Sequence, residues 1–103
     1  MAGRNPPEDC GIVKLVWTRT AAAADRRTIR AYIAQDNLTA ALALDELFSE
    51  KAALLIDHPM LGRAGRVAGT RELVAHRHYV LVYDLTGNRV RVLRVLHAAR
   101  QWP

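Results

Sequence analysis

The sequence predicts an α+β domain in which an antiparallel β-sheet carries an N-terminal helical hairpin on one face. Two observations predict it. The first half of the chain holds two stretches with apolar residues at helical spacing, and the second half holds short β-rich runs separated by turn residues. The element order is β-α-α-β-β-β, and 103 residues suffice for one modest core. We expect residues 13–103 to form this domain and residues 1–12 to be a flexible leader.

The first strand is expected over Ile12–Trp17, where the residues are β-rich and alternate loosely. A helix is expected over Ala21–Ala34, because a run of alanines favours the helical state and Thr18 or Thr20 can cap its start. Apolar residues recur on one face of this segment, so the helix is amphipathic.

A second helix is expected to start after a cap at Asn37 or Thr39. It ends at His58-Pro59, since the residue before a proline disfavours the α conformation. Two helices joined this tightly are expected to pack as an antiparallel hairpin.

The second half is expected to form a meander. Residues Met60–Thr70 read as a loop rich in glycine and arginine. The run Tyr79-Val80-Leu81-Val82-Tyr83 is continuously apolar, which predicts a strand buried on both faces. The strands and turns that complete the meander are Arg71–Ala75, the turn His76–His78, the turn Thr86–Asn88 and the strand Arg89–Leu96.

Arg94 lies among apolar neighbours in the last strand unless a bulge intervenes. A buried arginine needs an acidic partner. The sequence therefore predicts an ion pair between Arg94 and an acid of the helices, with Asp45 and Glu46 as the candidates.

The positive charge of the chain is concentrated in its second half. The net charge is +5, and after residue 57 the sequence has eight arginines and no lysine against only Glu72 and Asp84. Arginine binds phosphate and carboxylate with a bidentate fork, so this half is expected to attract a polyanion or an acidic protein. The sequence has no membrane-spanning apolar run and no secretory signal, and a lone Cys10 suits the cytoplasm.

No motif for a nucleotide, a dinucleotide or a metal is present, and we expect no cofactor and no metal. His76, His78 and His97 would be the candidate metal ligands, but no spacing demands such a site. His97, with Arg100 three residues later, can serve acid–base chemistry on a phosphodiester. The competing interpretation is that His97 only hydrogen-bonds the backbone where the strand ends.

Three segments together resemble the RelE/ParE toxin family: the loop and strand Pro59–Leu73, the strand Tyr79–Tyr83 and the stretch Leu93–His97. The helical segment Ala24–Ile33 resembles the first helix of that family. The resemblance implies a compact α+β toxin of a type II toxin–antitoxin module, neutralised by a cognate antitoxin. Toxins of this family either cut messenger RNA on the ribosome or poison DNA gyrase.

The resemblance implies a catalytic set of Arg71, His97 and Arg100 if the chain is a ribonuclease. Leu73 and Val80 stand where that branch has basic residues, and no tyrosine follows the last strand. The sequence therefore favours a ParE-like toxin that binds gyrase without chemistry of its own. On this hypothesis the arginine-rich half and the C-terminal tail bind gyrase, while the helical hairpin and the open side of the sheet bind the antitoxin. The target-binding candidates are Arg63, Arg66, Arg77, Arg89 and Arg91.

The first alternative is a ribosome-dependent ribonuclease. The second is a plain nucleic-acid-binding module. That module is disfavoured because the sequence shows no aromatic stacking platform beside the arginines.

Overall fold

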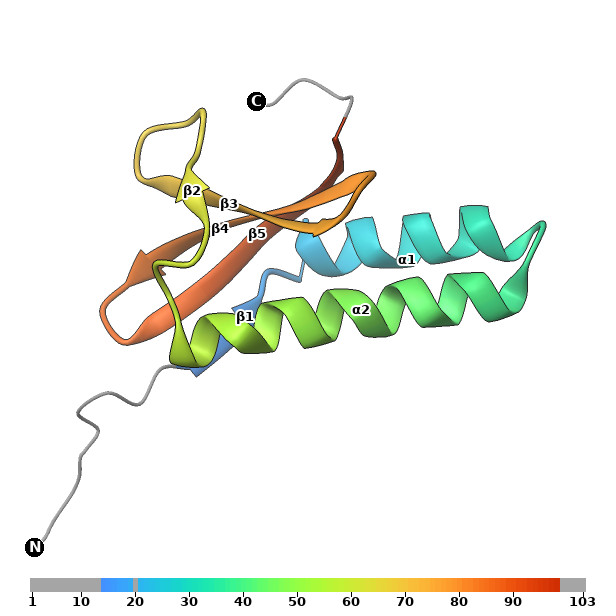
Figure 1. Cartoon of the computed structure of the whole chain (residues 1–103), viewed down its shortest axis with the longest axis horizontal. Coiled ribbons are helices and arrows are strands. Elements are labelled where there is room, and N and C mark those ends of the chain that lie inside the picture. Colours follow the sequence, from blue (N-terminus) through green and yellow to red (C-terminus); the bar gives the residue numbers. More distant parts are fainter. Residues whose placement is uncertain (1–13, 20, 99–103) are drawn as a thin grey trace, which may run out of the picture.

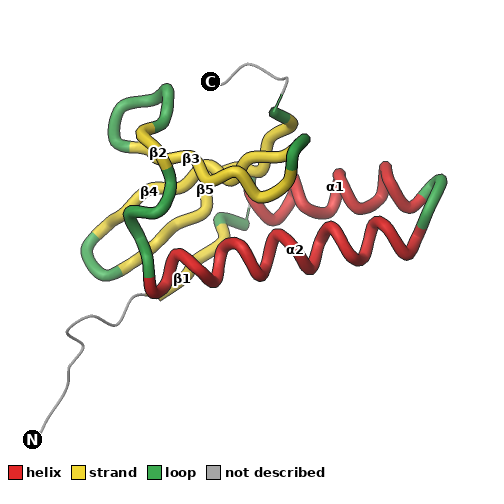
Figure 2. Tube along the Cα trace, viewed as in Figure 1, coloured by secondary structure: helices red, strands yellow, loops and turns green. Residues whose placement is uncertain are grey.

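The computed structural model describes residues 14–19 and 21–98. The predicted leader with Cys10, and the tail with Arg100, lie outside the described residues. Figures 1 and 2 show two layers, with a helical hairpin below a twisted sheet. The elements are β1 (Lys14–Trp17), α1 (Ala22–Ala34), α2 (Leu38–Asp57), β2 (Arg63–Ala64), β3 (Thr70–His76), β4 (Tyr79–Thr86) and β5 (Arg89–His97).

The sheet is mixed, so the prediction of an antiparallel sheet is wrong in one respect. The strand order is β1-β5-β4-β3-β2, and β1 runs parallel to β5 while the other pairs are antiparallel. The helical hairpin carries the chain from β1 to the far edge of the sheet, and the meander then returns strand by strand to β1. Alternation of apolar residues sets which face a side chain occupies but not the direction of its strand, so the sequence did not reveal the parallel pair.

The predicted loop Met60–Thr70 also contains the two-residue strand β2. Its residues Arg63 and Ala64 pair with Glu72 and Arg71 of β3. So short a strand, with glycines on both sides, carries no periodic signal that sequence reasoning can detect.

Thr18 joins the first strand to the first helix. The N-cap position of α1 is Ala21, so the prediction that Thr18 or Thr20 occupies it is wrong, but Thr18 still binds the first helical turn. Its hydroxyl accepts a hydrogen bond from the Ala22 amide at 3.0 Å, and its carbonyl accepts one from the Ala23 amide at 2.9 Å. The same hydroxyl lies 3.1 Å from the carbonyls of Val92 and Leu93 on β5. Thr18 thus ties the start of α1 to the middle of β5 while it satisfies free amides of the first helical turn.

Both helices pack on one face of the sheet, as predicted. Phe48 of α2 is 1% exposed and meets Tyr79 edge to face, with ring centroids 5.6 Å apart. The rest of the main core comes from both layers: Ala22, Ala52, Ala75, Leu81, Val92 and Val95. A bulge in β5 explains the irregular pattern of that strand, because Tyr83 lies opposite Val92 and Val82 opposite Arg94, which leaves Leu93 as the extra residue.

A buried tyrosine fixes the linker between α2 and β2. The Tyr83 hydroxyl donates to the Pro59 carbonyl at 2.9 Å and accepts from the Gly62 amide at 2.8 Å, and the side chain is fully buried. A Cβ atom at Gly62 would lie 2.7 Å from the Tyr83 ring and 2.8 Å from the Glu72 carbonyl, so only glycine fits there. The linker path therefore depends on this contact.

Replacing Tyr83 with phenylalanine tests that dependence. The substitution keeps the ring but leaves the Gly62 amide buried without a partner, so we expect the free energy of unfolding to fall by about 1–3 kcal/mol in chemical denaturation. Tyr32→Phe is the matched control, because Tyr32 is 71% exposed and should change stability by less than about 0.5 kcal/mol. Equal stability of the Tyr83 variant and the wild type would contradict this account.

Candidate functional site

The face of the sheet opposite the helices carries the arginines predicted to bind a target. Alternation along β3 and β4 places Leu73 and Leu81 against the helices and Glu72 and Val82 on the other side, which we call the open face. A hollow of about 120 Å³ lies on this face; we call it the arginine hollow. Its lining residues are Arg63, Arg66, Glu72, Val74, Arg77, Val80, Val82, Leu96, His97 and Ala98.

Glu72 is the acid of the arginine hollow, and only 6% of it is exposed. Its carboxylate accepts from the Arg66 backbone amide at 3.2 Å and from the Arg63 guanidinium at 3.5 Å. Within the described part of the chain, the guanidinium groups of Arg66 and Arg77 make no ion pair. The hollow therefore keeps a surplus of positive charge.

The two other predicted target-binding arginines lie at the opposite end of β4. The Arg91 guanidinium donates two hydrogen bonds of 2.9 and 2.6 Å to the Asp84 carboxylate, and these bonds raise the pKa of Arg91. Arg89 is exposed beside the β4–β5 turn. The five arginines thus form two groups, three at the hollow and two at the turn.

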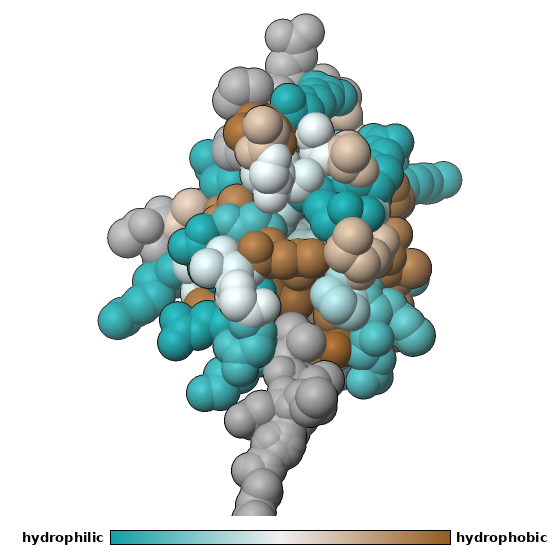
Figure 3. All heavy atoms as spheres, turned by 90° about the vertical axis from the view of Figure 1, so that its left-hand side faces the viewer, coloured by the Kyte–Doolittle hydropathy of each residue, from teal (hydrophilic) through white to brown (hydrophobic). Residues whose placement is uncertain are grey.

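Figure 3 views the molecule from the end where the β4–β5 turn lies. Hydrophilic side chains cover most of that end around a smaller apolar area. Exposed large apolar residues lie near the end of α2, in the linker that follows it and near the β4–β5 turn: Leu54, Met60, Leu61 and Leu85.

The structure does not bring Arg71 and His97 together. The Arg71 guanidinium donates to the carbonyls of Gly62 at 2.9 Å and Met60 at 3.2 Å, which holds the α2–β2 linker. Arg71 lies opposite Tyr83 and His97 opposite Tyr79, so four residues along β4 and two strand spacings separate their Cα atoms by about 16 Å. Arg100, the third member of that predicted set, lies outside the described residues.

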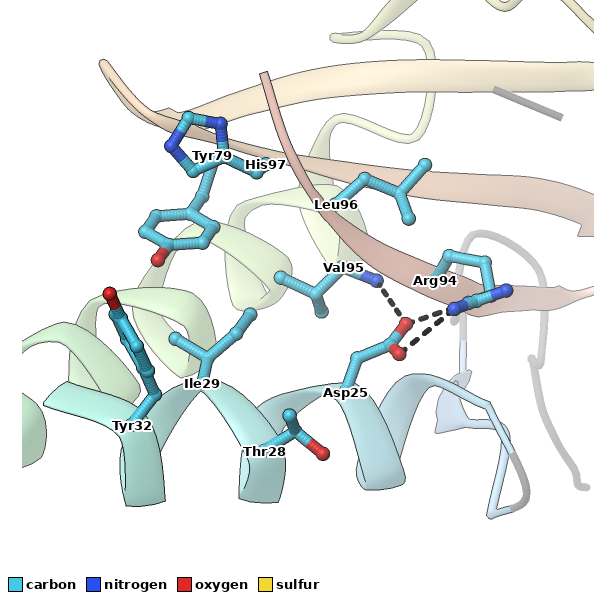
Figure 4. Close-up of a pocket in the computed structure, with 9 residues that line it drawn as sticks. All are labelled: Asp25, Thr28, Ile29, Tyr32, Tyr79, Arg94, Val95, Leu96 and His97. Carbon is cyan, nitrogen blue, oxygen red and sulfur yellow. Dashed lines mark hydrogen bonds and ion pairs between the residues drawn. The ribbon is translucent and has the colours of Figure 1, made fainter. Parts of the chain in front are cut away.

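A second and larger cavity lies between α1 and β5, and we call it the α1–β5 groove. Its volume is about 530 Å³. Strand β1 pairs only with Arg89–Val92, so the second half of β5 has no strand partner on this side within the described residues. Figure 4 shows Tyr32 and Tyr79 pointing toward one another at one end of the groove and Asp25 at the other.

Asp25 closes the unpaired edge of β5. Its carboxylate accepts from Arg94 Nε at 2.7 Å, from Arg94 Nη2 at 3.0 Å and from the Val95 amide at 3.0 Å (Figure 4). These hydrogen bonds raise the pKa of Arg94. The predicted pairing of Arg94 with a helix acid is right in kind but wrong in partner. Asp45 instead binds Arg26 at 2.9 Å and Arg30 at 3.3 Å, within the helical hairpin.

Histidine and tyrosine rings gather where β3, β4 and β5 meet beside the hollow. His97 stacks on His78 with centroids 5.6 Å apart and planes at 16°, and it meets Tyr79 edge to face at 5.4 Å. The sequence grouped these histidines only as candidate metal ligands. It did not predict the ring stack, because the strand register, and not the spacing along the chain, brings His78 and His97 together. Among the described residues, no group of three or more acids, histidines or cysteines is arranged to hold a metal ion.

Comparison with known proteins identifies the family. The model of the "ParE toxin of type II toxin-antitoxin system, parDE" matches residues 15–102. The chain belongs to the ParE toxin family. It is therefore a toxin of the type II toxin–antitoxin class, and such a system implies a cognate antitoxin as its partner.

Individual relatives and a solved structure agree with this. The chain is 38% identical over 76 residues to "Putative toxin Y4kP" of Sinorhizobium fredii, which covers 73% of this chain and 78% of that protein. It is 36% identical over 89 residues to "Toxin RelE2" of Caulobacter vibrioides, covering 86% and 99%. A structure of the chromosomal ParDE system from P. aeruginosa matches with a TM-score of 0.74 and 26% identity, covering 84% of this chain and 97% of that one. Within the described residues, no helix is long and apolar enough to cross a membrane.

Replacing Asp25 with alanine tests the edge closure of this ParE-family fold. The change leaves the Val95 amide and the Arg94 guanidinium without their carboxylate, so we expect the melting temperature to drop by several degrees, roughly 4–8 °C for each kcal/mol lost. Asp36→Ala is the control, because Asp36 is exposed in the α1–α2 turn and makes no ion pair among the described residues. If the Asp25 variant has the same melting temperature as the Asp36 control, the contact between Asp25 and β5 is dispensable for stability.

Proposed function

We propose that this toxin inhibits growth as a ParE-like poison of DNA gyrase, by binding its target and not by chemistry of its own. The family match and the similarity to a ParDE structure support this branch. The antitoxin neutralises the toxin by binding it.

The observation that carries the proposal is the position of Arg71. The guanidinium that would stabilise a phosphorane in a ribonuclease is already engaged by two linker carbonyls. The Cα atoms of Arg71 and His97 are about 16 Å apart in the strand register, whereas groups that act on one phosphodiester must converge within hydrogen-bond reach of it. This arrangement supports a structural role for Arg71.

The open face is the surface that we assign to the target. It presents Arg66, Arg77 and Arg89 exposed and, within the described residues, without an ion pair. Charges of this kind speed association with an anionic partner and fix its orientation. The acids of this face, Glu72 and Asp84, are each held by an arginine of the chain and oppose such a partner little.

The α1–β5 groove is the surface that we assign to the antitoxin. It combines an unpaired strand edge with apolar and aromatic walls, including Ile29, Tyr32 and Tyr79. A helical peptide can use the apolar walls, since a groove offers pockets for its side chains, whereas Asp25 already binds the Val95 amide of the strand edge. This assignment keeps the antitoxin on the helical-hairpin side, as the sequence-based hypothesis had it. It differs from that hypothesis in one respect, because it gives the open face of the sheet to gyrase and not to the antitoxin.

A ribosome-dependent ribonuclease remains the second candidate, on one specific observation. His97 lines the arginine hollow, so an imidazole and three guanidinium groups share one site. A relative bears the name RelE2. In this candidate Arg71, His97 and Arg100 would form the catalytic set, with the ribosome and messenger RNA as partners.

Induction of the toxin alone, followed by pulse labelling of DNA and protein, separates the two candidates. We expect DNA synthesis to stop first, because gyrase is the target, and His97→Ala to keep most of the toxicity. The control is co-induction of the antitoxin, which should restore both syntheses. If protein synthesis stops first and His97→Ala abolishes the effect, the ribonuclease candidate replaces the gyrase proposal.

Substitution of Tyr32 tests the antitoxin groove. Tyr32→Ala removes an exposed ring from the groove wall, and we expect about a tenfold weaker antitoxin complex in titration calorimetry, with toxicity unchanged. Leu38→Ala is a matched control, because Leu38 is 61% exposed and does not line the groove. Unchanged antitoxin affinity in the Tyr32 variant would place the antitoxin on another surface.

A further inference from the structure

The arginine hollow has an apolar floor. Val82 is 1% exposed and Leu96 is 9% exposed, and Val74 and Val80 complete the lining. At about 120 Å³ the hollow is well below the roughly 300 Å³ of ordinary small-molecule sites. It therefore suits one flat group attached to a longer ligand and not a whole metabolite.

The rim of the arginine hollow is cationic. Arg66 contacts Glu72 only through its backbone amide, so its guanidinium remains available, and Arg77 is exposed in the β3–β4 turn. Arg63 spans 3.5 Å to Glu72 with 67% of its side chain exposed. Three arginines and one carboxylate thus line the hollow, and the surplus positive charge favours an anionic ligand.

Aromatic rings stand at one end of the same rim. His97 lines the hollow, and the exposed His78 stacks on it at 16°. Sequence reasoning disfavoured nucleic acid because no aromatic platform accompanied the arginines, and the strand register supplies one. Stacked rings beside guanidinium groups are the combination that binds unpaired bases along with their phosphates.

We propose that the arginine hollow binds a single strand of nucleic acid, with phosphates on Arg66 and Arg77 and a base against the His78–His97 stack. This inference goes beyond the proposed function. If the proposed function holds, the bound single strand is DNA that gyrase holds. A duplex fits less well, because its bases are already stacked on one another and show no free face to His78. An acidic peptide would meet the arginines but would not need the rings.

Fluorescence anisotropy of the full chain tests the site without gyrase. The probes are labelled strands of about 12 nucleotides, as single-stranded DNA, single-stranded RNA and duplex DNA of one sequence. For the R66Q/R77Q variant we expect about tenfold weaker binding of single-stranded DNA. The slope of log affinity against log salt should also lose about 1.4, since each phosphate contact on a single strand contributes roughly 0.7.

Further variants separate the contribution of ring stacking to binding from the contribution of charge. H78A should weaken binding about tenfold at an unchanged salt slope, and H78F should restore it, because stacking and not charge is removed and replaced. The charge control is R27Q/K51Q, which removes the same two charges from the helical layer and should change affinity less than about twofold.

The outcomes divide cleanly. Tighter binding of single-stranded RNA than of single-stranded DNA supports the single-strand site and identifies RNA as its ligand. Equal loss in R66Q/R77Q and R27Q/K51Q, equal affinity for duplex, or no binding of any probe overturns the inference. Because the readout contains no gyrase, arrest of DNA synthesis with no strand bound would leave the proposed function standing and the inference refuted.

Discussion

Strand β5 pairs with β1 over only half of its length, and the rest of the molecule is arranged around that limit. Over Arg89–Val92, strand β5 pairs with a strand on each side. β1 ends opposite Val92, and there the chain leaves β1 through Thr18 and enters α1. Asp25, in the first turn of α1, supplies the acceptor that a neighbouring strand would have given to the Val95 amide. The edge is thereby protected from indiscriminate pairing, while the α1–β5 groove remains open beside it.

A second constraint acts at the other edge of the sheet. Tyr83 and Arg71 together bind the carbonyls of Pro59, Met60 and Gly62, so the linker after α2 has one path. That path delivers β2 to the edge of β3 and brings Arg63 and the Arg66 amide to Glu72. The arginine hollow is therefore a consequence of a hydrogen-bond network on the other face of the sheet. The half-buried Arg71 holds the linker, while the exposed Arg66 lines the hollow.

Much of this fold follows from the sequence, because its helices and strands are set by local periodicity, caps and turn residues. Thr18, Asn37 and the Gly87 turn are local signals, and the structure uses all three. The direction of β1, the choice of Asp25 by Arg94 and the stack of His78 on His97 depend on register between distant segments. Composition located the arginine-rich half, but it could not show that Arg71 holds a loop while Arg66 and Arg77 face outward.

The groove and the hollow lie on opposite sides of β5, and Leu96 and His97 line both. A ligand in either cavity therefore contacts a residue that bounds the other. An antitoxin seated in the groove would restrain His97 and, through the 5.6 Å stack, His78, without covering the arginines themselves. By this route the antitoxin would change strand binding in the arginine hollow and not the binding of gyrase, which is expected to survive loss of the His97 ring. The coupling arises because two sites that share one element influence each other when each ligand favours its own arrangement of that element.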